Sequence, residues 1–175
     1  MTTNPRDIAG AVPAGVYRID PQRSTVAFTT RHMFGLAPVR GTFTLLDGEI
    51  RIGDPVGEST ARATIDAASF TTDKPKRDAD VKSPKLLDVA QYPTISFVGD
   101  LTREDADGYR HSGALTAHGV TQPVEITIDA VTESIPEINL KASVRIDRYA
   151  FGVTKVKGMA ARHLDLHLDV TALRT

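Results

Sequence analysis

The sequence predicts an all-β protein, built as an antiparallel barrel of about eight strands. From Val16 onward, apolar residues recur mostly at every second position, which is the period of a strand with one buried face. Most strand-like runs are separated by short turn signals, which favour antiparallel neighbours. One-faced strands must bury their apolar faces, and a closed barrel does so while removing exposed edges. A sandwich of the same strands is the alternative.

The predicted strands follow one another with few interruptions. In the first half of the chain they cover residues 25–32, 39–45, 49–52 and 60–66. In the second half they cover residues 94–98, 109–117, 124–129, 140–147 and 163–170. Asp47-Gly48 is a tight-turn signal, so we expect the runs on either side of it to be separate strands.

One segment, residues 66–97, lacks the strand pattern over most of its length. Ser83 can cap a helix that begins at Pro84, because proline lacks an N–H that would be unpaired at that position anyway. We therefore expect a short helical insertion near residues 76–91. Its apolar underside would be formed by residues at helical spacing, Leu86, Leu87 and Ala90. The insertion is expected to act as a lid over the barrel mouth; a surface excursion packed on the barrel wall is the alternative.

Composition limits the partners and the location. The 175 residues suit one domain, which we divide into a flexible tail over residues 1–14 and a barrel over residues 15–175. A net charge of −1 gives no overall basic field for nucleic acid or an anionic membrane surface. No run of about 18 apolar residues occurs, so we expect no transmembrane segment. No apolar run near Met1 has the length of a signal peptide, which predicts a cytoplasmic protein.

The inward-facing residues predict an apolar interior with room for a ligand. Bulky and small side chains are mixed, and tryptophan is absent. Barrels of about eight strands either fill with side chains or hold one small ligand, and both remain open here. The candidate lining residues are Phe28, Phe43, Ile65, Phe97, Leu115, Ile126, Val144 and Leu166. At the mouth, His32 and Arg148 could hydrogen-bond a polar head group, or Arg148 could instead form an ion pair with Asp78.

Catalytic and metal chemistry have little support in the sequence. There is no cysteine, no nucleophile-elbow motif, no zinc-protease motif and no phosphate-binding glycine loop, so we predict no catalytic residue and no enzyme. His163-x-Asp165-x-His167 has metal-friendly residue types on one strand face. Its histidines are about 13 Å apart along an ideal strand and face solvent, so we predict no metal site.

Four segments resemble the YceI-like family of polyisoprenoid-binding proteins. They are YRIDPQRSTVAFTTRHMFGLAPVRGTF, ATIDAASFTTDKPKRDADVKSPKLLDVAQYPTISF, SGALTAHGVTQPVEITI and SVRIDRYAFGV. The similarity is collinear and covers nearly everything from about Val16 to the C-terminus. This sequence departs from the family pattern in three places: Arg23 replaces a histidine, Asp80-Val81 replaces a His-Leu pair, and Leu86-Leu87 replaces two aromatics.

The resemblance implies a lipocalin-like extended barrel that holds a polyisoprenoid lipid, such as the tail of an isoprenoid quinone or a prenyl chain. It implies non-catalytic storage or transport, with the lipid as ligand and no cofactor. Many members are periplasmic and dimers are common, so a homodimer is expected. Two alternatives of other classes remain open: an enzyme that acts on a hydrophobic small molecule in the same cavity, and a filled barrel that binds other proteins.

Overall fold

The computed structural model describes residues 12–175 and contains nine strands and one α-helix in that range. The strands are β1 Gly15–Ile19, β2 Thr25–His32, β3 Ala37–Ile52, β4 Thr60–Thr71, β5 Thr94–Asp105, β6 Gly108–Ala117, β7 Val120–Ser134, β8 Glu137–Asp147 and β9 His163–Arg174. The helix is α2 Pro75–Lys82, and short 3-10 turns are η2 Pro21–Arg23, η3 Val56–Glu58 and η4 Arg148–Phe151.

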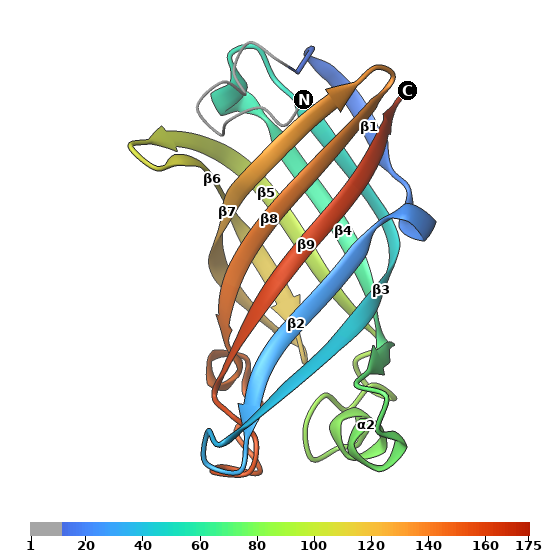
Figure 1. The fold of residues 1–175 in the computed structure, drawn as a ribbon, viewed down its shortest axis with the longest axis vertical. Coiled ribbons are helices and arrows are strands. Elements are labelled where there is room, and N and C mark those ends of the chain that lie inside the picture. Colours follow the sequence, from blue (N-terminus) through green and yellow to red (C-terminus); the bar gives the residue numbers. More distant parts are fainter. Residues whose placement is uncertain (1–11) are drawn as a thin grey trace.

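All strand pairs are antiparallel, and they close into a barrel (Figure 1). The order β3-β2-β9-β8-β7-β6-β5-β4 returns to β3 through the β3–β4 pairing. β1 and β2 both pair with β3 and β9, β1 at the upper part of those strands and β2 at the lower part. The two strands therefore share one position in the barrel, with η2 between them. The barrel therefore has eight positions, as the sequence predicted, and the sandwich alternative is wrong.

The two-residue period places the core where the sequence predicted it. Val26 and Phe28 on β2 are almost fully buried, and Leu45 on β3 is buried as well. A side chain on Gly41 would collide with the Phe28 ring and with the Thr71 carbonyl oxygen, so only glycine fits beside that ring. The barrel wall is thus one layer of sheet whose inner face is a continuous apolar surface.

The predicted turn at Asp47-Gly48 is wrong. β3 runs unbroken from Ala37 to Ile52, and its ladder with β4 is instead irregular between Leu45 and Asp47. The extra residue of this bulge keeps the strand continuous while bending it. Gly48 leaves space for the Ile19 side chain, which a Cβ at that position would meet.

The helical insertion exists, but its predicted start at Pro84 is wrong. α2 covers Pro75–Lys82, with Pro75 in its first turn, and Ser83 is its C-cap rather than an N-cap. Pro84 disfavours helical backbone at the residue before it, and Ser83 is accordingly extended, with φ −72° and ψ 168°. β4 also runs to Thr71, beyond the predicted end at residue 66.

The predicted tail lies mostly outside the described residues, which begin at Val12. Val12 itself is buried in the barrel core, and the Tyr17 hydroxyl donates to the Pro13 carbonyl oxygen at 2.8 Å. Within residues 12–175, no helix has the length and hydropathy needed to cross a membrane.

Candidate functional site

The barrel interior contains two cavities, one toward each end. The lower cavity, beside α2, has a volume of about 640 Å³. The upper cavity, beside η3, has a volume of about 180 Å³. Ile65, Leu115, Ile146 and Leu166 line both cavities. These four residues, which we call the neck, mark where the two cavities meet.

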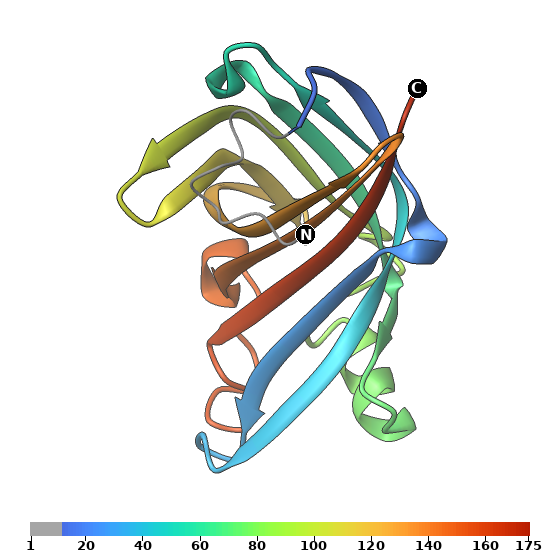
Figure 2. The ribbon, with the colours of Figure 1, turned by 45° about the horizontal axis from the view of Figure 1, so that its top comes forward.

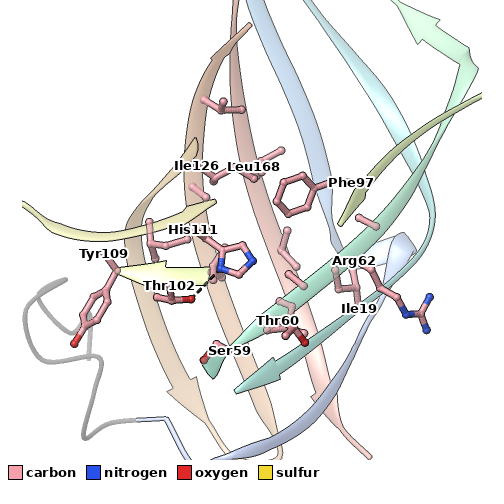
Figure 3. A pocket seen from close by; sticks show the side chains of 18 of the residues that line it. Ile19, Ser59, Thr60, Arg62, Phe97, Thr102, Tyr109, His111, Ile126 and Leu168 are labelled. Carbon is pink, nitrogen blue, oxygen red and sulfur yellow. Dashed lines mark hydrogen bonds between the residues drawn. The ribbon is translucent and has the colours of Figure 1, made fainter. Parts of the chain in front are cut away.

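The upper cavity is almost wholly apolar. Its walls come from the inward faces of most barrel strands, and few polar side chains reach it. One of them is His111 on β6, which is buried and whose Nδ1 lies 2.9 Å from the Thr102 hydroxyl on β5 (Figure 3). The His111 ring also packs edge-on against Phe97, with ring centroids 6.0 Å apart. Burial lowers the pKa of His111, so this imidazole is held neutral.

The lower cavity has an aromatic floor and a polar rim. Phe28 stacks on Phe70 with ring centroids 5.0 Å apart, and Phe43 packs edge-on against Phe70 at 5.4 Å. These three rings form one side of the cavity. The rim is formed by α2, the segment after it, and the long connection between β8 and β9. The lower cavity therefore combines a rigid apolar wall with an entrance built from connecting segments.

Arg148 holds the β8–β9 connection in place. It is buried in η4, just past the end of β8, and its guanidinium donates four hydrogen bonds to backbone carbonyl oxygens. The acceptors are Ala161 at 2.8 Å, Val153 at 2.6 Å, Lys155 at 2.9 Å and Ala160 at 2.9 Å. Burial lowers the pKa of this guanidinium. The role that the geometry supports for Arg148 is positioning the rim.

The predicted ion pair between Arg148 and Asp78 is wrong. Asp78 is buried in α2 and accepts hydrogen bonds from the Thr72 hydroxyl at 2.6 Å, the Thr72 N–H at 2.9 Å and the Thr71 hydroxyl at 3.1 Å. Burial alone would raise the pKa of Asp78, but these donors hold it below its ordinary value. Asp78 thus ties α2 to the end of β4, which explains why the helix sits earlier than predicted.

The segment that follows α2 faces inward. Leu86 is buried against Ile146, Phe151 and Val153, and Leu87 packs against the cluster that contains Phe28. Both leucines line the lower cavity. The position of this segment therefore fits the predicted lid, while its opening and closing stay a prediction.

Each predicted lining, head-group and lid residue lines one of the two cavities. Those on the lower cavity are Phe28, His32, Phe43, Ile65, Leu86, Leu87, Leu115, Arg148 and Leu166. Those on the upper cavity are Ile65, Phe97, Leu115, Ile126, Val144 and Leu166. Ala90, which was predicted on the apolar underside of the insertion, is exposed and lines neither cavity. His32 lies at the rim, where its backbone pairs with Ala160. Whether these residues contact a ligand stays a prediction.

Sequence reasoning missed His111 and Phe70. His111 shares the inward face of β6 with Leu115, four residues away, so the two-residue period could have found it. Phe70 lies beyond the predicted end of its strand, and no turn signal separates it from that strand. On the outer face, Asp165 lies between His163 and His167 and pairs with Arg145 at 3.1 Å, outside both cavities.

Comparison with known proteins supports this architecture. A family model described as the YceI-like domain matches residues 17–172. Protein YceI of Escherichia coli is 27% identical over 175 residues, which cover 95% of this chain and 91% of that protein.

Two solved structures have the same fold. BcnA of Burkholderia cenocepacia has a TM-score of 0.73 at 22% identity, covering 87% of this chain and 98% of that one. A polyisoprenoid binding domain from Saccharophagus degradans, implicated in plant cell wall breakdown, has a TM-score of 0.70 at 16% identity, covering 91% and 98%. At these identities the two structures show the fold alone. The match over residues 17–172, together with the closed eight-position barrel, places this chain in the YceI-like domain family.

Proposed function

We propose that the protein binds a polyisoprenoid lipid without catalysis, for storage or transport, with the tail running from the lower cavity through the neck into the upper cavity. The observation that carries the proposal is the continuous apolar lining of two cavities that share the neck residues. The lower cavity has a volume typical of small-molecule sites, which span about 300–1,000 Å³, whereas the upper cavity is smaller than that range. A long, thin ligand suits this shape better than a compact one.

Apolar burial alone can supply the affinity. Each isoprene unit has five carbons, and burial contributes roughly 0.8 kcal/mol per CH₂, or roughly 4 kcal/mol per unit. Two or three units give a gross term of about 8–12 kcal/mol, in the range from micromolar to nanomolar affinity before association costs. The neutral state of His111 supports the same proposal, because a charged imidazole would penalise an apolar tail beside it.

A polar head group, of a quinone or a prenyl lipid, belongs at the lower mouth in this proposal. His32 is half-buried at the rim, next to the tail path and close to water. Arg148 contributes indirectly, by fixing the β8–β9 connection that borders the mouth. The presence of two cavities favours ligand binding over the filled-barrel alternative. Cytoplasmic location and a homodimer stay predictions of the sequence.

Native mass spectrometry with lipid extraction tests the proposal first. We expect bound masses that resolve into isoprene increments. Titration of delipidated protein with a fluorescent prenyl quinone then gives the affinity, and lengthening the tail from one unit to three should tighten binding at each step. An affinity that does not depend on tail length would overturn the proposal, because the tail is the part that the cavities hold.

A further inference from the structure

The connecting segments at the two ends of the barrel carry opposite charge. Because neighbouring strands are antiparallel, the connections at residues 33–36, 72–93, 118–119 and 148–162 all lie at the lower end. Together they contain nine Lys or Arg and four Asp, a net charge of +5 in a chain whose total is −1. The connections at the upper end, residues 53–59, 106–107 and 135–136, contain three acidic residues and no basic one. The near-zero total charge therefore hides a cationic lower end.

The exposed lysines around α2 are available to an external partner, whereas Lys157 lies over the Tyr149 ring, 5.3 Å from its centroid. In the part of the chain that the structure describes, none of the six lysines at this end forms an ion pair. Lys74, Lys76 and Lys85 lie on the rim of the lower cavity itself and are exposed. Exposed lysines that serve no internal pairing contribute long-range attraction to an anionic surface.

Large apolar side chains project beside these lysines. Half of the large hydrophobic residues that are exposed in residues 12–175 lie at the lower end: Met33, Phe34, Leu36, Val156 and Met159. Phe34 is 80% exposed and Leu36 is 81% exposed. Together these five residues form what we call the apolar tip. Clustered exposed apolar residues of this kind mark an interaction site rather than ordinary surface.

The apolar tip is an ordered feature of the fold. The Phe34 N–H donates to the Gly158 carbonyl oxygen at 2.6 Å, and the Met33 N–H donates to the Met159 carbonyl oxygen at 3.1 Å. The β2–β3 turn and the β8–β9 connection are therefore joined, and Figures 1 and 2 show them together at the lower end, across from α2. Met33, Phe34 and Val156 have left-handed backbone, which is unfavourable for such residues. Neither burial nor backbone preference explains apolar residues there.

We propose that the lower end docks onto an anionic lipid bilayer, with the apolar tip inserted at the interface and the lysines of the α2 region against the head groups. The proposal rests on the proposed function in one respect: a polyisoprenoid partitions into bilayers, and docking places the mouth of the lower cavity at their surface. Apolar residues flanked by cations are the combination that binds proteins to membrane surfaces. The lower cavity opens between the two groups, since Met159 and Lys76 both line it.

Sedimentation with ligand-free vesicles tests the docking surface apart from ligand binding. The probes are vesicles of phosphatidylcholine alone and vesicles in which about one third of the lipid is phosphatidylglycerol, a mixture with a negative surface potential. We expect the protein to bind the anionic vesicles and to be released when salt rises from about 0.1 M to about 1 M, which shortens the Debye length from about 10 Å to about 3 Å. Equal binding to both vesicles, or binding to neither, would overturn the proposal. An acidic protein would then be the alternative partner of the cationic end.

Two variants separate the charged and apolar contributions. The double variant Lys76→Glu with Lys85→Glu should bind anionic vesicles at least roughly 25-fold more weakly, since each lysine near such a surface contributes about fivefold. The double variant Phe34→Asn with Leu36→Ser should bind roughly tenfold more weakly or worse. Asparagine is chosen at position 34 because it tolerates the left-handed backbone.

Control variants make the same charge change, and a single apolar substitution, at the upper end. Arg51→Glu with Arg103→Glu gives the same charge change on exposed positions of β3 and β5, and Ile135→Ser removes an apolar side chain that is exposed at the β7–β8 turn. We expect vesicle binding as in the unmodified protein for both controls. Losses as large as those of the lower-end variants would mean that total charge or hydrophobicity governs binding, and the docking surface would be wrong. Titration with prenyl quinone in the absence of vesicles reports the proposed function independently.

Discussion

The upper and lower cavities are walled by the same strands, yet they differ in size, polarity and access. The upper cavity is about 180 Å³, and its few polar side chains include the buried imidazole of His111. The lower cavity is about 640 Å³ and has a rim of lysines, arginine and histidine supplied by connecting segments. Strand periodicity therefore determines the apolar interior of both, while the connections determine which of the two has a polar entrance.

This difference suits the two cavities to different parts of an amphiphile, its apolar tail and its polar head. An apolar tail gains free energy wherever it leaves water, so either cavity can hold it. A polar head loses free energy when it is buried without partners, so it belongs where water and hydrogen-bonding groups remain available. In the proposed function the tail end therefore lies in the upper cavity and the head at the lower mouth, and substitutions that act on one cavity only test this assignment.

The largest effect is expected on the wall of the lower cavity. Phe28→Ala should lower the free energy of unfolding by about 3–5 kcal/mol, because Phe28 is almost fully buried and packs against Phe43 and Phe70. Chemical denaturation measures this. Phe34→Ala, at an aromatic position that is mostly exposed, is the matched control, and its effect should stay within about 0.5 kcal/mol. Equal losses for both would mean that the aromatic floor is not part of the rigid core.

The next effect concerns the upper cavity. Ala63→Trp should fill space in that cavity while leaving the lower one open, because Ala63 lines only the upper cavity. A quinone with a long tail should then bind at least about tenfold more weakly, since a single lost isoprene contact is worth several kcal/mol before costs. A quinone with one isoprene unit should bind as before.

Ala68→Trp is the matched control for this prediction. It makes the same change at an exposed position on the same strand and should leave both affinities unchanged. Undiminished binding of the long tail by a folded Ala63→Trp protein would remove the upper cavity from the tail path.

A smaller effect is expected at the lid. Replacing Leu86 and Leu87 by serine should raise the rate of ligand release several-fold, because both leucines pack inward over the lower cavity. Binding itself should persist, since most of the lining is untouched. Stopped-flow displacement of a fluorescent prenyl quinone measures the release rate, with Val98→Ser on the exposed barrel wall as the control. An off-rate equal to that of the unmodified protein would make this segment part of the wall rather than a lid.

The sequence predicted the barrel and its lining because both follow from local alternation. The predicted run 25–32 coincides with β2, and parity alone placed residues such as Ile126 and Leu166 inside. The start of the helix was not predictable in the same way, because Pro75 and Pro84 both offer a first-turn signal. The contacts between Asp78 and the end of β4 decide between them, and they depend on where β4 ends.

The hydrogen-bond partners of Arg148 could not be predicted from the sequence, for a different reason. Its four acceptors are backbone carbonyl oxygens, which every residue carries, so no side-chain pattern marks them. Asp78 is an opposite charge that the sequence does reveal, and it led to the wrong prediction of an ion pair with Arg148. Irregular connections are therefore the part of this site that required a structure, and they form the rim of the lower cavity.

His111 was missed although parity marked it, and it gives the smallest predicted effect. Burial lowers its pKa in the folded protein, so below the ordinary histidine value of about 6.5 the unfolded chain binds a proton that the folded one does not. Stability should therefore decrease as pH falls from about 7.5 to about 5.5, by at most about 1.4 kcal/mol per pH unit from this group. His111→Gln should flatten this part of the curve in denaturation at each pH. Parallel curves for His111→Gln and the unmodified protein would mean that His111 takes up a proton as readily inside the upper cavity as in the unfolded chain. The contrast between an apolar upper cavity and a polar lower entrance would then be wrong.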